Sequence, residues 1–142
     1  MTRLLMLVEG QSEESFVKRT LAPHLAGYGV FVQVIVLWTK RLASGGGHRG
    51  GACNWGQIRR NLDTLRADSH AWLTTLLDFY GLPDDVPGYQ EARLPGDPRQ
   101  RVNALQARLA AEVRHPRFIP FLALHEFEAW IFADSKALAA HF

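Results

Sequence analysis

The chain has 142 residues, 47% of them hydrophobic, which is enough for one domain with a buried core. Its 16 lysines and arginines nearly balance its 14 aspartates and glutamates, so the net charge of +2 argues neither for nor against a polyanionic partner. The single cysteine, Cys53, excludes an intramolecular disulfide and a thiolate cluster for structural zinc, and no apolar run approaches the ~20 residues of a membrane span. We therefore expect one soluble, cytoplasmic domain over residues 1–142, with no membrane partner.

The first half of the chain predicts two strands, each followed by a helix. Residues 4–8 form a continuous apolar run typical of a strand buried on both faces, and residues 12–25 follow with apolar side chains at helical spacing. Gly27 marks the end of this helix. Residues 30–38 are apolar except for Gln33 and predict a second strand, and residues 55–67 return to helical spacing after a glycine-rich loop.

The second half repeats this alternation. A third strand is expected over residues 71–77, and the proline- and glycine-rich residues 79–98 predict a long loop rather than a helix or strand. Residues 98–113 predict a helix, residues 118–124 a fourth strand, and residues 127–142 a helix that continues to the end of the chain. This order predicts an α/β fold, with a doubly wound open parallel sheet of about four strands flanked by helices.

Acidic residues follow three of the predicted strands. The first strand ends at Glu9, the third at Asp78 and the fourth at Glu126, and Gly10 allows the chain to turn sharply behind Glu9. Ligands of open parallel sheets bind at the carboxyl ends of the strands, so these carboxylates are expected at one edge. Their oxygen atoms suit Mg²⁺ or Mn²⁺, and such an ion can stabilise a transferring phosphoryl group and lower the pKa of a bound water.

The second strand leads instead into a basic loop with the sequence GGGHRGG. Its backbone N–H groups and the side chains of Lys40, Arg41, His48 and Arg49 are candidates for binding phosphate oxygens. The loop lacks the glycine and lysine order of a P-loop, and glycines also make plain flexible linkers. Both interpretations of the loop stay open.

Several of these motifs resemble a known family. LVEGQSEESF, LLDFYG and HEFEAW are similar to the motifs of Toprim-type domains. Together with GGGHRGG and DFYGLP, they resemble an uncharacterised bacterial Toprim-like family, domain of unknown function 4276, related to the OLD-type nucleases. The resemblance implies a Toprim-like, Rossmann-like fold and a Mg²⁺-dependent phosphodiesterase acting on nucleic acid. It also suggests bacterial defence alongside an ABC-type ATPase.

The resemblance assigns roles to individual residues. Glu9 matches the Toprim glutamate, a general acid/base or metal ligand, and Asp78 matches the first acid of a D-x-D pair that binds Mg²⁺. The second D-x-D position is Tyr80, which departs from the pattern. Glu126 or Glu128 would then supply the missing ligand. We prefer Glu126, because it lies nearer the strand end and residues two apart on a helix point in nearly opposite directions.

The same residues also fit purely structural roles. Glu9 could belong to a helix cap, Asp78 could open an Asx-turn, and Glu126 and Glu128 could form a solvated helix face. Because Tyr80 replaces an acid, the protein could also be a catalytically degenerate binding or adaptor module, and a small-nucleotide hydrolase or binder would use the same edge. Family members tend to be longer than 142 residues, so the chain can lack a C-terminal part. The sequence leaves the substrate, partner and oligomeric state open.

Overall fold

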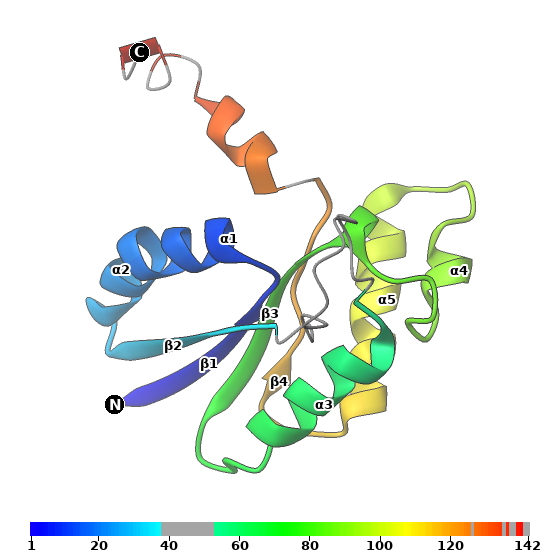
Figure 1. Ribbon diagram of the computed structural model, residues 1–142, viewed down its shortest axis with the longest axis horizontal. Helices are drawn as coiled ribbons and strands as arrows, with labels where there is room; N and C mark the ends of the chain where they lie inside the picture. Colours follow the sequence, from blue (N-terminus) through cyan, green and yellow to red (C-terminus); the bar gives the residue numbers. More distant parts are fainter. Residues whose placement is uncertain (38–52, 126, 135, 137–138, 141–142) are drawn as a thin grey trace, which may run out of the picture.

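The chain folds around an open parallel β-sheet with helices on both faces (Figure 1). The structure, a computed structural model, describes residues 1–37, 53–125, 127–134, 136 and 139–140. The strands are β1 (Thr2–Val8), β2 (Val30–Val36), β3 (Trp72–Asp78), β4 (Phe118–Ile119) and β5 (Leu122–Ala123). Within the described residues the sheet order is β2-β1-β3-β4, β5 also pairs with β3, and these pairings are parallel. The predicted fold class is therefore confirmed.

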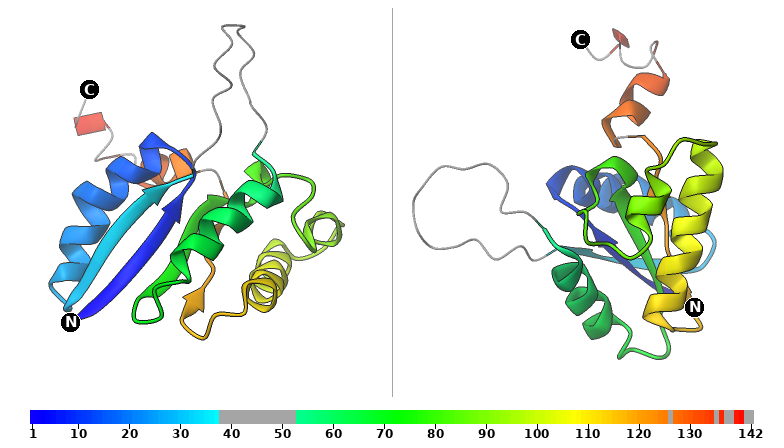
Figure 2. Two further views of the ribbon diagram at one scale, coloured as in Figure 1. Left: turned by 60° about the horizontal axis from the view of Figure 1, so that its bottom comes forward. Right: turned by 90° about the vertical axis from the view of Figure 1, so that its right-hand side faces the viewer.

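Alternation along the strands divides the core into two layers. Met6, Val8 and Leu76 point to one face, where Val17 packs on them. Leu5 and Leu7 point to the other face. The helical segments are α1 (Gln11–Phe16), the π-helical η1 (Val17–Leu21), α2 (Ala22–Ala26), α3 (Trp55–Leu65) and α5 (Pro98–Val113). The first three are continuous and cover the first face, and α3 and α5 cover the second (Figure 2).

The topology creates a switch point between β1 and β3. These strands are neighbours in the sheet, with Leu4 opposite Trp72 and Val8 opposite Leu76, so they end at nearly the same level. The helices after β1 lie on one face and α3, which leads into β3, lies on the other (Figure 1). In open α/β sheets this is the place where the crevice for a ligand forms.

The predicted fourth strand is split into two short ones. Pro120 separates β4 from β5 because it has no N–H group to donate to a neighbouring strand. The buried Thr75 side chain compensates on β3: its hydroxyl donates to the Phe121 carbonyl at 2.8 Å and accepts from the Phe121 N–H at 3.0 Å. The prediction of one continuous strand over residues 118–124 was wrong for this reason.

Two predictions about irregular segments also need correction. Residues 79–98, predicted as a loop, contain a 3₁₀ turn, η2 (Phe79–Gly81), and a short helix, α4 (Tyr89–Ala92), with Phe79 and Tyr89 in the core. The helix predicted over residues 127–142 begins as a 3₁₀ helix, η3 (Phe127–Ala133), and is interrupted at Asp134. The helix predicted over residues 98–113 is confirmed as α5.

None of the helices in the described parts of the chain combines the length and the apolar character needed to cross a membrane.

Candidate carboxylate site at the strand ends

Glu9 and Asp78 lie at the ends of the two neighbouring strands at the switch point. Asp78 is the last residue of β3, and Glu9 directly follows β1. Gly81 lies beside both: a Cβ atom built on it would lie 3.5 Å from the Asp78 Cβ and 3.6 and 3.7 Å from the Glu9 carboxylate oxygens. The Asp78 residue is half-buried and Glu9 is exposed. Gly81, which carries no side chain, therefore lies between the Glu9 carboxylate and the Cβ atom of Asp78.

A different glutamate caps the first helix. Gly10 is the N-cap of α1, and its N–H donates to the Glu13 carboxylate at 3.1 Å. Glu13 is buried in this role, whereas Glu14 pairs with Lys18 at 2.6 Å on the surface. Because Glu13 performs the capping, the helix does not explain the position of Glu9 against Gly81.

The turn after β3 holds Gly81 over the strand end. Phe79 is fully buried, and its ring makes edge contacts with Tyr80 and Tyr89, with centroids 5.0 and 5.6 Å apart. This anchor fixes the 3₁₀ turn that brings Gly81 back toward Glu9. Within the described turn, Asp78 occupies the N-cap position without a side-chain capping hydrogen bond. A capping function of that kind therefore does not account for the Asp78 carboxylate.

A small cleft beside Glu9 brings in residues that the sequence did not indicate. Its volume is about 20 Å³, and Glu9, Cys53, Gly81 and Pro83 are among the residues that line it. That is room for about one water molecule.

The negative charge of Glu9 contributes to the raised pKa of the Cys53 thiol, which lines the same cleft. Burial raises the pKa of Cys53, and the carboxylates of Glu9 and Asp85 raise it further, because each disfavours a nearby thiolate. Asp85 also accepts a hydrogen bond from the Trp55 N–H at 2.9 Å, which ties the segment after β3 to the start of α3. Nothing in the sequence signalled the proximity of Cys53 and Asp85 to Glu9, because they are far apart along the chain.

The remaining predicted ligands are not placed. Glu126 lies outside the described residues, as do the four predicted phosphate-binding residues Lys40, Arg41, His48 and Arg49. Glu128 belongs to η3, but its side chain is outside the description. In the described ranges, no three His, Cys, Asp or Glu side chains form a group that could hold a metal ion. Of the predicted metal ligands, Glu9 and Asp78 are thus the two whose side chains the structure describes.

The two carboxylates fit part of a magnesium site. Mg²⁺ prefers oxygen ligands and is commonly held by one or two carboxylates, with water and substrate phosphates completing its coordination. Gly81 leaves the Glu9 carboxylate approachable, because a side chain at this position would lie in contact with it. Glu9 and Asp78 are therefore the described residues that could hold part of such an ion's coordination.

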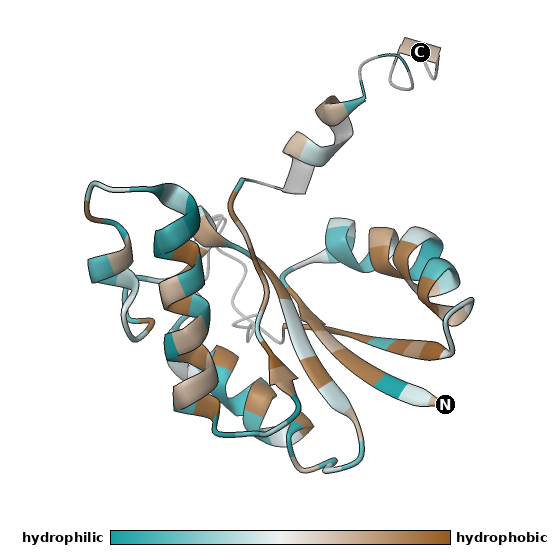
Figure 3. Cartoon of the chain, turned by 180° about the vertical axis from the view of Figure 1, so that it is seen from behind, coloured by the Kyte–Doolittle hydropathy of each residue, from teal (hydrophilic) through white to brown (hydrophobic). Residues whose placement is uncertain are grey.

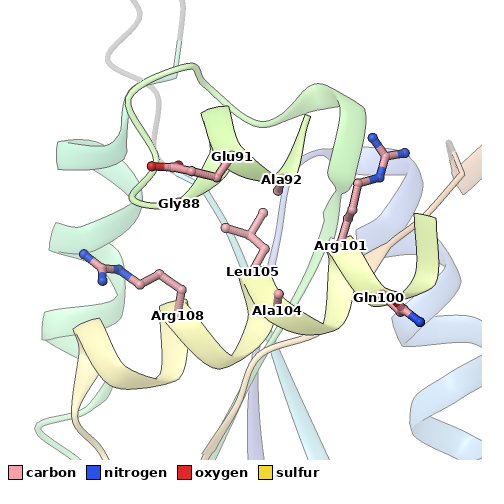
Figure 4. A pocket seen from close by; sticks show the side chains of 8 residues that line it. All are labelled: Gly88, Glu91, Ala92, Gln100, Arg101, Ala104, Leu105 and Arg108. Atoms are coloured by element: carbon pink, nitrogen blue, oxygen red, sulfur yellow. The ribbon is translucent and has the colours of Figure 1, made fainter. Parts of the chain in front are cut away.

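One arginine near this edge lies at the end of a larger cavity. The cavity, about 540 Å³, is formed between α4 and α5, and Figure 4 shows Arg101 and Arg108 at its opposite ends. The Arg101 Nη1 donates to the Leu94 carbonyl at 2.9 Å, and its Cζ lies 6.0 Å from the centre of the Phe79 ring. Since Phe79 directly follows Asp78, this contact fixes a positive charge near the end of β3.

The fold and the site define the chain as an open parallel α/β protein with acidic residues at its topological switch point. Residues 8–142 match the family described as Domain of unknown function (DUF4276), and the chain belongs to this family. No curated protein matches the chain, and no solved structure does. The relation to Toprim-type domains stays a prediction from the sequence motifs.

Proposed function

We propose that this protein is a metal-dependent phosphodiesterase acting on nucleic acid, with Mg²⁺ or Mn²⁺ bound by Glu9 and Asp78. The observation that carries this proposal is that Glu9 and Asp78 follow or end neighbouring strands at the switch point of the sheet, with Gly81 beside the Glu9 carboxylate and the Asp78 Cβ. Bound here, the ion would stabilise the negative charge of a transferring phosphoryl group. The remaining ligands would come from Glu126 or Glu128, from water and from the substrate.

The two acids have different roles in this proposal. Asp78 ends β3 and is half-buried, and we assign its carboxylate the role of metal ligand. Glu9 is exposed and lies just beyond the end of β1, so it is the better group to exchange a proton with a substrate or a water. Arg101 and the basic loop with Lys40, Arg41, His48 and Arg49 would attract the phosphate backbone.

A degenerate binding or adaptor module is the second candidate. Tyr80 stands where the Toprim pattern has a second acid, and its side chain is 56% exposed with its ring edge against Phe79. It supplies no carboxylate, so metal affinity would rest on fewer charges. The single cysteine is compatible with a cytoplasmic setting, and the family resemblance favours an ATPase partner in either case.

Metal titration and cleavage of plasmid DNA test this function together. Mg²⁺ and Mn²⁺ are titrated by calorimetry into wild type, Glu9→Gln, Asp78→Asn and the control Glu14→Gln, which alters only a surface ion pair with Lys18. We expect binding and nicking in wild type and the control, and loss of both in the two site variants. Metal binding that survives in both site variants would refute the assignment. Metal binding without nicking of DNA or RNA would favour the binding module.

A further inference from the structure

The cavity between α4 and α5 contains an arginine without an acidic partner. Arg101 is half-buried, and its Nε atom is buried without a hydrogen-bond acceptor. Its Nη1 donates to the Leu94 carbonyl, but none of the ion pairs among the described residues includes Arg101. Burying part of a charged group costs free energy unless a counter-charge replaces the lost hydration. An anion bound beside Arg101 would offset this cost.

The positive charge of the cavity is concentrated at the Arg101 end. Arg108, at the opposite end, pairs with Glu112 at 3.1 Å, so its charge is already offset. Figure 4 shows the Glu91 carboxylate on the side of Arg108, away from Arg101. A negatively charged group is therefore favoured at the Arg101 end and disfavoured near Glu91.

The cavity has room and apolar surface for an organic group beside this anion. Ala92, Ala104 and Leu105 line it, and Figure 3 shows hydrophobic and hydrophilic residues alternating along α5, beside α4. Gly88, with a φ of 84°, approaches α5 so closely that a Cβ atom built on it would lie 3.1 Å from the Arg108 Cγ. The volume of about 540 Å³ lies within the roughly 300–1,000 Å³ of small-molecule sites.

The Arg101 end of the cavity lies on the side of the carboxylate site. The Arg101 Cζ is 6.0 Å from the centre of the Phe79 ring, and Phe79 directly follows Asp78. Helix α5 begins at the same end of the molecule at which β1 and β3 finish (Figure 1). Arginine binds phosphate through parallel, charge-assisted hydrogen bonds, and a phosphate is also the group on which a phosphodiesterase acts. A phosphate is therefore the anion that suits this position.

We propose that this cavity binds a nucleotide, with the phosphate on Arg101 and the sugar and base against Ala92, Ala104 and Leu105. The choice of a nucleotide among organic phosphates rests on the proposed function, whereas the cavity and the unpaired arginine do not depend on it. The nucleotide is either a free mononucleotide or one unit of a nucleic-acid chain that reaches the carboxylate site.

Calorimetry in EDTA tests the cavity without the metal site. The probes are thymidine monophosphate, thymidine and a thymidine tetranucleotide. The variants are Arg101→Gln and Ala104→Phe, which removes the charge or places a ring in the cavity. Their controls are Arg99→Gln and Ala107→Phe, because both residues are exposed on α5 and do not line the cavity.

We expect wild type and both controls to bind thymidine monophosphate with the same affinity. Thymidine should bind at least about tenfold more weakly, because it has no group for a charged hydrogen bond with Arg101. Arg101→Gln and Ala104→Phe should each weaken binding of the monophosphate by about tenfold or more. A tetranucleotide that binds more tightly than the monophosphate, again through Arg101, identifies one unit of a nucleic acid as the ligand. Equal or weaker binding of the tetranucleotide identifies a free mononucleotide.

A wild type that binds neither phosphate probe overturns the proposal. So does binding that both cavity variants leave unchanged, because the nucleotide must then lie elsewhere. Far-UV circular dichroism checks the fold of each variant, and Ala104→Phe, at an exposed position, tests the cavity even if Arg101→Gln unfolds. Since EDTA removes the metal, failure of the proposed metal site leaves these results unchanged, and failure of the cavity leaves the metal titration unchanged.

Discussion

The carboxylate of Glu9 has a measurable effect on a neighbouring residue. Cys53 has a raised pKa because of burial and, after that, because of the negative charges of Glu9 and Asp85. Glu9→Gln removes one of these charges, so the Cys53 pKa should fall and more thiolate should be present at a given pH. Since the thiolate is the reactive form, we expect iodoacetamide to alkylate Cys53 faster in Glu9→Gln than in wild type at about pH 8.

Cys53 is the only cysteine in the sequence, so mass spectrometry of the intact chain follows this reaction without interference. Glu14→Gln removes a carboxylate that is paired with Lys18 on the helix surface, and it serves as the control. Equal alkylation rates in all three proteins would mean that Glu9 is not close enough to influence the thiol. The assigned electrostatic coupling in the cleft would then be wrong.

Residues of the site differ in how far the sequence can predict them. Glu9 and Asp78 are predictable because an acid at the end of an apolar strand has a known position in a parallel sheet. Gly81 and Asp85 are not, because their positions depend on a turn anchored by Phe79, in a segment whose prolines and glycines predict a loop. Cys53 reaches the cleft through the start of α3, which no local pattern reveals.

Among the strands, the joint between β4 and β5 depends on one hydroxyl group. Thr75 is 2% exposed and makes two hydrogen bonds to Phe121, one as donor and one as acceptor. Thr75→Val keeps the shape but leaves the Phe121 N–H and carbonyl without this partner, at a cost of about 1–3 kcal/mol for each group that stays buried. We expect unfolding by urea to show a loss of about 2–4 kcal/mol in stability.

Thr64→Val is the matched control, because the Thr64 hydroxyl donates to the Arg60 carbonyl on an exposed helix surface. Its stability should change by less than about 0.5 kcal/mol. If Thr75→Val were equally mild, the strand break at Pro120 would be held by something other than this side chain.

Helix α4 carries a pH dependence through Tyr89. Burial raises the pKa of this phenol, the charges of Asp84 and Tyr80 raise it further, and Arg93 lowers it. Because the folded-state pKa lies above the unfolded value of about 10, the folded chain binds this proton more tightly. The stability that this proton provides is present below about pH 10 and is lost as the pH rises through the folded-state pKa.

We therefore expect the stability of wild type to fall more steeply than that of Tyr89→Phe between about pH 9 and pH 11. Urea unfolding at several pH values measures both slopes. Cys53 also titrates in this range, but it contributes equally to the two proteins, so the difference isolates Tyr89. Parallel curves would show that the Tyr89 phenol ionises as easily in the folded chain as in the unfolded one.

The elements themselves are predictable where one face of periodic apolar residues dominates. The helix over residues 98–113 matches α5 at both ends, because Asp97 caps its start and Val102, Leu105 and Leu109 form its buried stripe. The prediction of one strand over residues 118–124 was wrong because an apolar run does not show which backbone groups form hydrogen bonds across the sheet. Pro120 has no N–H group to donate to such a bond. The short helix α4 was not predicted, because prolines and glycines dominate the sequence around it. Its structure depends instead on the burial of Val86 and Tyr89.

At the scale of the whole molecule, the sheet separates two surfaces with different chemistry. Its carboxyl edge gathers charged groups around Gly81, whereas the exposed half of its α1 face is an uncharged groove. The proposed metal-dependent chemistry belongs to the first surface alone. Variants of Glu9 or Asp78 therefore test the proposed function without altering the apolar face.

Metal binding at the edge should stabilise the entire fold. A ligand that binds only the folded state adds about 1.4 kcal/mol when its free concentration is about ten times its Kd. For a chain of this length that corresponds to a rise in Tm of roughly 3–6 °C. We expect Mg²⁺ to raise the Tm of wild type by this amount, EDTA to reverse it, and Glu9→Gln to show no rise. All samples are compared at one protein concentration. Ile119→Asp should keep the Mg²⁺ effect even if its Tm is lower, because Ile119 is exposed on β4, opposite Thr74 and away from the end of β3. If Mg²⁺ does not change the Tm of wild type, or raises the Tm of Glu9→Gln by the same amount, the assignment of Glu9 as a metal ligand is wrong.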